Sequence, residues 1–300
     1  YGRVDHGGVF LLQSKLYLNA ETMIGQAHYE DCITACEKII AAGYSLEPNY
    51  EELFMKDNHN SNEIIFALTS DGSRTQSWGC TTFLVHAAIG GSMSDADSGV
   101  SGGWGGLRTT KNLVERFPDT SGEIDSRAIF WTDGQSIDIN EIGLFTDGIA
   151  VPKFKNININ GESGSNSTFP DTDYPMFRLA DAFLMYVEAT LRGATNGDLG
   201  QAIDLVNEIR MRAYGDDSGN ITQGELDLDF IIEERSRELY WEANRRIDLV
   251  RFGLFTSADY LWPWKGNEIG GRGVEEYRDI FPIPASDLIA NPNLVQNPGY

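Results

Sequence analysis

The sequence predicts a mainly α-helical protein of tetratricopeptide-like helical hairpins, with long loops and a minor β insertion. Two helix pairs of similar length, at about 7–43 and 177–214, lead to this prediction, because stacked pairs cover each other's apolar faces. Between them, at about 69–175, the composition shifts to Gly, Ser and short strand-like runs. We expect a single domain over residues 1–300 that ends in an irregular tail at 254–300.

The first helix pair is predicted from helical spacing of apolar residues. Leu12, Leu16 and Ala20 fall on one face of a helix that ends at Gly25. A second helix follows at once and ends before Gly43, a residue favoured just after helices. We therefore expect a helical hairpin whose apolar face contains Leu12, Leu16 and Ala20.

The second pair and the insertion are predicted in the same way. Helical spacing runs over about 179–191 and 199–213, with a short Gly/Asn loop between. Inside the insertion, "SRAIFWTDGQ", "GLFTDGIAVPKFKN" and "INING" combine β-branched and aromatic residues with Asp-Gly turns. These runs predict short strands and hairpins.

Composition limits the classes of partner. The formal net charge is −22, which excludes a nucleic-acid partner, because such binding depends mainly on cations. No run reaches the ~18 apolar residues of a membrane helix, and "YGRVDHGG" is no signal peptide and lacks an initiator Met. We expect a C-terminal portion of a longer protein.

The three cysteines, Cys32, Cys36 and Cys80, predict neither a disulfide framework nor a zinc site, and we expect all three to be core residues.

The stretch "EERSRELYWEANRRIDLVRFG", residues 233–253, carries many acids and arginines. On one helix, the expected ion pairs are Glu233–Arg237, Arg235–Glu238 and Glu242 with Arg245 and Arg246. A glycosidase needs two carboxylates roughly 5 to 9.5 Å apart, one of them protonated. Neighbouring guanidinium groups lower a carboxyl pKa instead, so we interpret this stretch as a scaffold and expect no catalytic residues.

Two segments resemble the C-terminal signature of the SusD/RagB family of Bacteroidetes outer-membrane nutrient-binding lipoproteins. They are the charged stretch, extended to "LDFIIEERSRELYWEANRRIDLVRFGLF", and "FPIPASDLIANPNLVQNPGY" at the end of the sequence. Further segments upstream are also similar to the family: "LLQSKLYLNAETMIGQAHYEDCITACEKIIAAGYSL", "WGGLRTTKNLVERF" with "DSRAIF", and "YPMFRLADAFLMYVEAT". The resemblance covers nearly all 300 residues.

The resemblance implies a tetratricopeptide scaffold whose loops bind a glycan or other small nutrient at the cell surface. It further implies that the protein acts as a lid on a SusC-like TonB-dependent transporter, with no catalysis and no cofactor. Family members begin with a lipidated cysteine and an N-terminal half that this sequence lacks. A membrane link through a lipid anchor, and an outer-membrane location, are therefore implied rather than read from the residues.

Candidate ligand-binding residues come from sugar chemistry, because sugars stack on aromatic rings while polar groups at the rim bind their hydroxyls. Trp78 lies in "DGSRTQSWGC", with Arg74 and Gln76 close by. Trp104 lies in the glycine-rich "SGGWGG", but in a segment that resembles the family's shared middle motif, which favours a structural role. The family has no residue motif for its glycan site.

The other tryptophans and the metal candidates are weaker. Trp262 and Trp264 bracket Pro263, either as an exposed pair or as a hydrophobic clasp, whereas Trp131 and Trp241 read as core. The acidic turns at 94–99 and 216–225 do not fit a calcium loop, so no metal ligands are expected. The four histidines form no catalytic motif.

Two other functions remain open at this point. One is a helical-repeat module that binds a protein, which the hairpins favour and the long Trp/Gly loops do not require. The other is a glycoside hydrolase. Incubation with a panel of polysaccharides separates these two functions from glycan binding. A glycan-binding protein releases no reducing ends, whereas a hydrolase does, and a protein-binding module binds no glycan.

Overall fold

The computed structural model describes residues 2–300. The chain divides into two compact units, one ending at Ala243 and the other running from Asn244 to Tyr300. The larger unit contains both predicted helix pairs and the insertion between them.

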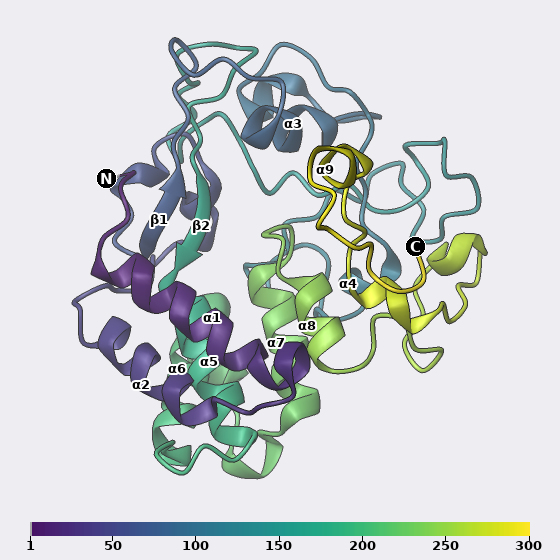
Figure 1. Ribbon diagram of the computed structural model, residues 1–300. Coiled ribbons are helices and arrows are strands. Elements are labelled where there is room, and N and C mark those ends of the chain that lie inside the picture. The colour runs from purple at the N-terminus through teal and green to yellow at the C-terminus, as the bar shows by residue number, and fades with distance from the viewer. Residues whose placement is uncertain (1) are drawn as a thin grey trace. The chain divides into compact units, whose positions relative to one another are not determined.

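In the larger unit, five long helices pack together in the lower part of Figure 1. They are α1 (His6–Ile24), α2 (Tyr29–Ile40), α5 (Leu179–Leu191), α6 (Leu199–Tyr214) and α7 (Leu228–Leu239). Every side chain of α5 from Leu179 to Ala189 is buried, because α1, α2, α6 and α7 all pack against it. The predicted helical hairpins are confirmed, and α5 forms their centre.

The α1–α2 hairpin has the predicted ends but a different buried face. Asp5 caps α1 by accepting from the Gly8 N–H, and Gly25 ends it with a left-handed φ of 71°. The buried residues include Leu11, Ser14 and Leu18, whereas Leu12 and Leu16 are 49% and 63% exposed. Ala20 is buried as predicted, but the prediction was wrong for Leu12 and Leu16. The small Ser14 lies at the interface instead, where its carbonyl and hydroxyl accept from the thiols of α2.

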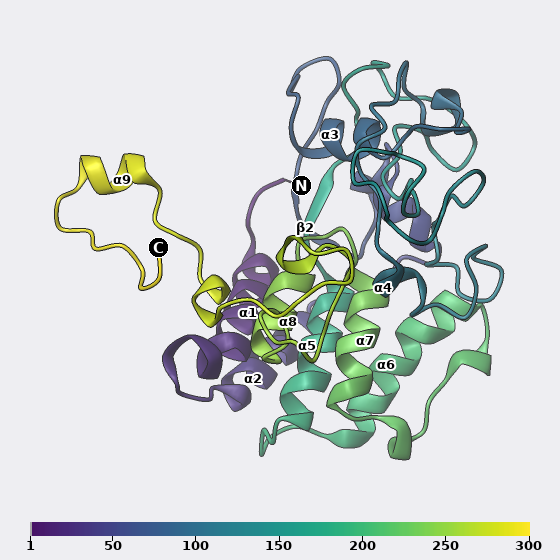
Figure 2. The same ribbon diagram turned by 90° about the vertical axis from the view of Figure 1, so that its right-hand side faces the viewer.

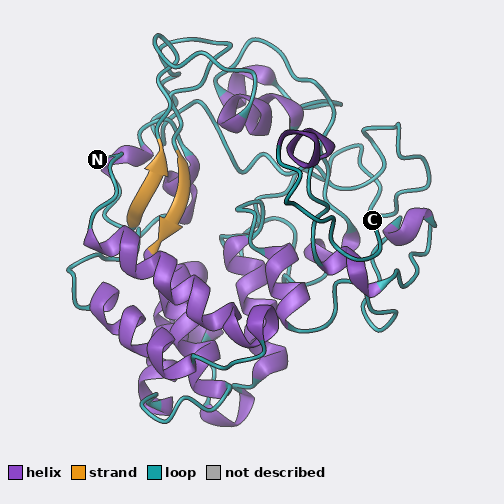
Figure 3. Cartoon of the chain, in the orientation of Figure 1, coloured by secondary structure: helices purple, strands orange, loops and turns teal. Residues whose placement is uncertain are grey.

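The sheet flanks the insertion rather than filling it. β1 (Ile64–Leu68) pairs antiparallel with β2 (Tyr174–Arg178), with Leu68 opposite Tyr174. Between them the chain is mainly loop, with two short helices, α3 (Cys80–Ala87) and α4 (Lys111–Val114), as Figure 3 shows. The strands predicted within the insertion were wrong, because those runs form only isolated bridges such as Trp131 with Ala150.

A second apolar core holds the insertion in place. Its members come from widely separated segments: Tyr50, Leu53, Phe54, Ile64, Ala67, Val85, Ile89, Val100, Phe117, Ala128, Ile129, Val151, Phe154 and Tyr240. Val85 anchors α3 in this core and Ile89 anchors the residues that follow the helix. The loops around α3 therefore stand on a packed base, although they contain little regular structure.

The charged stretch predicted as one helix is broken. α7 ends at Leu239, and α8 (Arg245–Arg251) begins the smaller unit. Trp241 and Ala243, between the helices, have left-handed φ values of 61° and 59°, a conformation that non-glycine residues rarely adopt. Glu242 lies in this break, where its carboxylate accepts from Lys153 and Arg178 rather than lying on a continuous helix with Arg245 and Arg246.

Acids and bases from six segments of the larger unit form what we call the buried ion network. Its members are Glu63, Asp125, Arg127, Lys153, Arg178, Arg210, Arg212, Glu234, Arg237, Glu238 and Glu242. Arg127 donates to Glu234 at 2.7 Å and to Asp125 at 2.7 Å, with all three side chains fully buried. Arg178 bridges Glu63, Glu238 and Glu242. The charges of 233–242 therefore join α7 to the loops and to β2.

The smaller unit is irregular, as predicted for the tail. Apart from α8 it contains short 3-10 turns and α9 (Ala285–Ala290), which lies at the end of an extended loop in Figure 2. None of the helices formed by residues 2–300 combines the length and apolar composition needed to cross a bilayer.

Candidate functional site

Four aromatic rings gather at the surface of the insertion, and we call them the aromatic cluster: Trp78, Phe83, Trp104 and Phe169. The Trp78 ring centre lies 5.1 Å from Phe169 and 6.2 Å from Trp104, which lies 6.2 Å from Phe83. Trp78 is 64% exposed, Trp104 45% and Phe83 44%. Large aromatic side chains are mostly buried on average, so a contiguous set of exposed rings marks this surface as a candidate binding site.

Trp78 is carried by the loop that follows β1, and Asp171 holds this loop in place. The Asp171 carboxylate accepts from the backbone N–H of Gly72 at 2.7 Å and of Ser165 at 2.5 Å. Burial alone would raise the pKa of Asp171, but these N–H bonds keep it below its usual range. Gly72 is required here, because a Cβ would lie 2.1 Å from the Phe169 carbonyl oxygen. The two loops that bring Trp78 and Phe169 together are therefore tightly joined.

Trp104 is positioned by the carboxyl end of α3. The backbone N–H groups of Trp104 and Leu107 donate to the carbonyls of His86 and Ala87, at 2.8 and 2.7 Å. The last carbonyls of a helix lack regular partners within it. The His86 carbonyl also accepts from the Ile89 N–H at 3.3 Å, and the glycine-rich loop supplies further donors to both carbonyls. Gly103 allows this approach, because a Cβ there would lie 2.4 Å from the Ile89 carbonyl oxygen.

His86 lies beneath the Trp104 ring. The two rings are nearly parallel, with centres 5.0 Å apart. The imidazole is buried and its two nitrogens lie within hydrogen-bond distance of the carbonyls of Gly102 and Thr168, the latter at 2.8 Å. His86 thus links the loop of Trp104 to the loop of Phe169, and acts as a positioning residue for the cluster.

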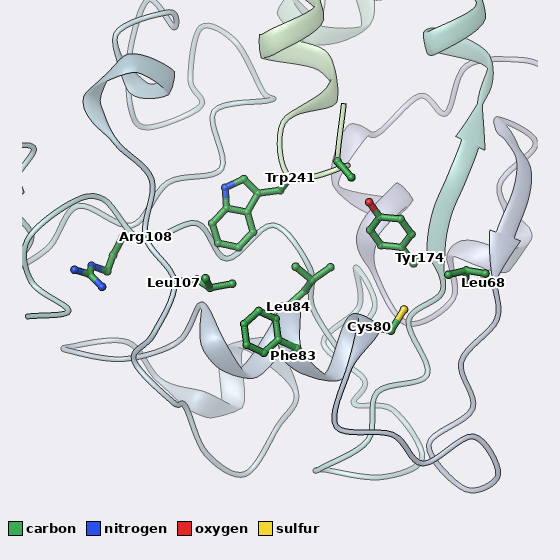
Figure 4. Close-up of a pocket in the computed structure, with 9 residues that line it drawn as sticks. Leu68, Cys80, Phe83, Leu84, Leu107, Arg108, Tyr174 and Trp241 are labelled. Carbon is green, nitrogen blue, oxygen red and sulfur yellow. The ribbon is translucent and has the colours of Figure 1, made fainter. Parts of the chain in front are cut away.

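A cavity of about 640 Å³ adjoins the cluster at Phe83. Its lining residues are Leu68, Cys80, Phe83, Leu84, Leu107, Arg108, Tyr174, Trp241 and Ala243. Figure 4 shows the rings of Trp241 and Tyr174 on one side of the space and Phe83 with Leu84 on the other. We call this cavity the α3 pocket.

Trp241 and Cys80 differ from their predictions. Trp241 was expected in the core, and it packs against the second apolar core but is only partly buried and also lines the α3 pocket. Cys80 was expected in the core as well, whereas it is exposed at the start of α3. Cys32 and Cys36 are buried as predicted. Trp131, the other tryptophan expected in the core, is half-exposed, with its indole N–H donating to Ser92 and Asp133.

The structure brings together some of the predicted binding residues. Trp78 is exposed as predicted and lies beside Trp104, which was expected to be structural and is both packed on His86 and half-exposed. Arg74 and Gln76 lie on the Trp78 loop. The Arg74 guanidinium is exposed, 3.7 Å from Asp71, whereas the Gln76 amide donates to the Gly72 carbonyl and so fixes the loop.

Trp262 and Trp264 belong to the smaller unit. Both are half-buried, and Trp262 lies 5.8 Å from Phe255 and 6.0 Å from Tyr260, with the Lys265 ammonium 4.5 Å from its ring centre. Trp262 also lines a mixed cavity of about 550 Å³ with Arg246, Arg272 and Arg278. The clasp interpretation fits Trp262 better than an exposed pair.

Phe83 and Phe169 were not identified from the sequence. Phe83 lies in the apolar run "TTFLVHAAI", which reads as a buried helix. Phe169 had a usable signal, because "SGSNSTF" places an aromatic ring among small polar residues, as at Trp78. Across residues 2–300, no three His, Cys, Asp or Glu side chains are grouped so as to hold a metal ion, and the acidic turns at 94–99 and 216–225 form 3-10 turns.

The acids of the charged stretch have the electrostatics of a scaffold. Burial alone would raise the pKa of Glu234, but Arg127, Arg237 and Arg210 lower it to about 2. Glu238 is also held well below its usual pKa range despite burial, by Arg212, Arg178 and Arg127. Neither carboxyl carries the proton that a general acid must donate.

Comparison with solved structures confirms the fold. A surface glycan-binding protein A from Bacteroides thetaiotaomicron in complex with laminarihexaose aligns with a TM-score of 0.74 at 24% identity, over 99% of this chain and 64% of that one. A SusD superfamily protein from Parabacteroides distasonis gives a TM-score of 0.74 at 24% identity, over 100% and 64% of the two chains.

Sequence comparison identifies the family. The starch-binding protein SusD of Bacteroides thetaiotaomicron is 34% identical over an alignment of 348 positions, gaps included, which covers all of this chain and 61% of that protein. A SusD-like protein of Bacteroides ovatus is 26% identical, over 86% of this chain and 53% of its own length. The chain thus spans less than two thirds of the length of these relatives. A sequence model of the SusD family matches residues 123–300, and the chain belongs to this family.

Proposed function

We propose that this protein binds a glycan at the aromatic cluster, without catalysis, and passes it to a transporter. The observation that carries the proposal is the pair of exposed tryptophans, Trp78 and Trp104, with ring centres 6.2 Å apart. A sugar presents flat C–H faces that pack on such rings, and the exposed Arg74 guanidinium supplies hydrogen-bond donors on the same loop.

The names of the relatives support the same class of ligand. One relative is a starch-binding protein, and one structure of the same fold was determined with laminarihexaose. Starch and laminarihexaose are both neutral glucans, so a neutral oligosaccharide is the first class of ligand to test.

A glycoside hydrolase is the less favoured alternative. The named relatives include a starch-binding protein and a surface glycan-binding protein. The paired acids of the charged stretch, Glu234 and Glu238, are fully buried and bound by arginines. Hydrolysis needs one carboxyl group that stays protonated and a second across an open cleft, and these two acids meet neither requirement.

The partner we propose is a SusC-like TonB-dependent transporter at the outer membrane, with this protein held there by a lipid anchor on the full-length protein. Residues 244–300 carry six Lys and Arg against seven Asp and Glu, so almost all of the net charge of −22 lies in residues 1–243. Long-range steering would therefore favour a basic partner surface opposite the larger unit, and would weaken with salt. Co-purification of the full-length protein with a β-barrel transporter in mild detergent tests this part.

Calorimetric titration tests glycan binding directly. Maltoheptaose and laminarihexaose are titrated into wild type, Trp78→Ala, Trp104→Ala and the control Trp131→Phe, followed by a glycan array if neither binds. Both alanine variants should weaken binding of any glycan found, Trp131→Phe should not, and no reducing ends should appear. Unchanged affinity in both alanine variants, or release of reducing ends, would refute the proposal.

A further inference from the structure

One helix serves both the aromatic cluster and the α3 pocket. Cys80, Phe83 and Leu84 lie on one face of α3, at the spacing that aligns helical side chains. Phe83 lines the pocket and also packs near Trp104 in the cluster. A molecule held on the cluster therefore lies next to the pocket mouth.

The pocket wall is mostly carbon. Its one charged residue, Arg108, donates to three backbone carbonyls, those of Asp147, Gly106 and Ile142, at 2.7 to 3.1 Å. Figure 4 shows its guanidinium pointing away from the other lining side chains. No Asp or Glu lines the pocket. An anion would find no free cation in this pocket, and a cation would find no carboxylate.

The same wall is unsuited to a bare sugar ring. A sugar carries a hydroxyl on most of its carbons, and each hydroxyl that enters an apolar space without a partner loses its hydrogen bonds to water at a net cost. At about 640 Å³ the pocket has the volume of a small-molecule site. Its size and composition fit an apolar group better than a saccharide unit.

Two polar groups on the wall are available to a ligand. Within the described part of the chain, neither the Tyr174 hydroxyl nor the Trp241 indole N–H is bonded to another protein group. Both side chains are half-buried, so these donors are open to water or to a ligand acceptor, which such amphipathic side chains usually bind. Burial, with Glu242 and Cys80 nearby, raises the pKa of Tyr174, so its hydroxyl stays protonated. A ligand with one acceptor oxygen would satisfy it.

The backbone around the pocket is unusual as well. Cys80, Trp241 and Ala243 have φ values of 52°, 61° and 59°, and all three line the pocket. Non-glycine residues adopt this conformation at a cost that the surrounding structure must offset. The Trp241 ring lies on the pocket wall, on the opposite side from Phe83.

We propose that the α3 pocket binds a neutral aromatic acyl ester carried by the glycan, such as a cinnamoyl-type group. Its carbonyl oxygen accepts from the Tyr174 hydroxyl, and its ring packs among Phe83, Leu84 and Trp241. The flat aromatic wall favours a ring over an alkyl chain, because offset or edge-on ring pairs are attractive beyond their buried area. The link to a glycan rests on the proposed function, whereas binding of the ester does not.

Cys80 provides a direct readout, because it is the exposed thiol on this wall while Cys32 and Cys36 are buried. The rate at which iodoacetamide alkylates Cys80 is followed by mass spectrometry with ethyl cinnamate, ethyl octanoate, trans-1-phenyl-1-hexene or maltoheptaose. Ethyl cinnamate at saturation should slow alkylation about fivefold or more. The phenylhexene matches ethyl cinnamate in length but has no acceptor oxygen, so higher concentrations should be needed.

Two variants separate the pocket from the fold and from the cluster. Tyr174→Phe should leave thermal stability unchanged or higher, because the hydroxyl has no protein partner. It should weaken ethyl cinnamate binding roughly three- to tenfold without affecting binding of the phenylhexene, which has no acceptor oxygen. Trp78→Ala should leave ethyl cinnamate binding intact while it weakens an oligosaccharide. This pair distinguishes failure of the ester proposal from failure of the glycan proposal.

Three results would overturn the proposal. Ethyl cinnamate that neither binds nor slows alkylation removes the ligand. Equal protection by ethyl octanoate makes the pocket a general acyl site. Protection by maltoheptaose alone makes it part of the saccharide site.

Discussion

The buried ion network and the aromatic cluster both reverse the usual distribution of side chains, in which charged groups are exposed and large rings are buried. In the network, most arginines and carboxylates are buried and bonded to one another, as between Arg127 and Glu234. In the cluster, large rings such as Trp78 stand in solvent. Buried charges without partners are costly, so the network serves stability. Exposed rings contribute little to stability, so the cluster is available for a ligand.

This contrast separates two roles that the sequence left close together. The charged stretch looks catalytic because it is dense in acids, yet each acid there has guanidinium partners. The candidate binding surface lies in a Gly/Ser-rich loop region with few charges. Variants in the network should therefore change stability and leave binding alone, and variants in the cluster should do the reverse.

The largest effect is expected for Arg127→Ala. This substitution removes the buried guanidinium partner of Asp125 and one of the arginine partners of Glu234 and of Glu238. Breaking a buried pair typically costs about 3–5 kcal/mol. Urea denaturation measures the free energy of unfolding. Arg272→Ala removes an exposed partner of Glu268 and should cost at most about 1 kcal/mol. Equal losses in the two variants would contradict the role of the network.

The second largest effect is expected from acid, which should lower the stability that the buried ion network contributes. The pKa of Glu234 is about 2 in the folded protein against 4.5 for the free group, so its contribution is full above pH 4.5 and is lost as the pH falls toward 2. The difference corresponds to about 3 kcal/mol. Unfolding free energies between pH 7 and 2 should fall more steeply in wild type than in Glu234→Gln. Parallel curves would rule out this assignment.

Gly72→Ala should disturb the cluster through the backbone. The new Cβ would lie 2.1 Å from the Phe169 carbonyl oxygen, so the two loops must separate, at a cost of about 1–3 kcal/mol. Gly79→Ala on the same loop meets nothing closer than 3.7 Å and serves as the control. Glycan affinity should fall in the first variant only. A loss of affinity in both would point to the loop in general.

The smallest effect on stability is expected for Trp78→Ala. Aromatic stacking contributes about 0.5–1.5 kcal/mol beyond buried area, so glycan affinity should fall severalfold or more while the melting temperature hardly changes. Titration calorimetry and thermal denaturation of the same sample measure both quantities. A drop in melting temperature with unchanged affinity would place Trp78 with the scaffold.

Much of the helical fold was predictable because its signals are local. Gly25 ends α1 where the sequence places it. The buried face of α1 was not predictable from apolar spacing, because a small polar residue, Ser14, lies at the contact with α2 while Leu16 faces solvent. The break after α7 was hidden for a related reason, since Trp241 and Ala243 are not residues that favour a left-handed backbone.

The site was predictable in part. An aromatic residue among small polar ones identified Trp78, and the structure places it beside Trp104. Phe83 escaped because an apolar helix residue reads as core, and its exposure depends on how α3 packs through Val85. The α3 pocket joins residues as far apart as Leu68 and Trp241, and no local pattern predicts such a meeting.

A crystal structure with a bound oligosaccharide, chosen by the glycan array, would show whether the aromatic cluster is the glycan site. We expect a sugar ring packed on Trp78 or Trp104, at van der Waals distance from the ring face, with the buried ion network unchanged. A sugar bound elsewhere, with both rings uncovered, would contradict it.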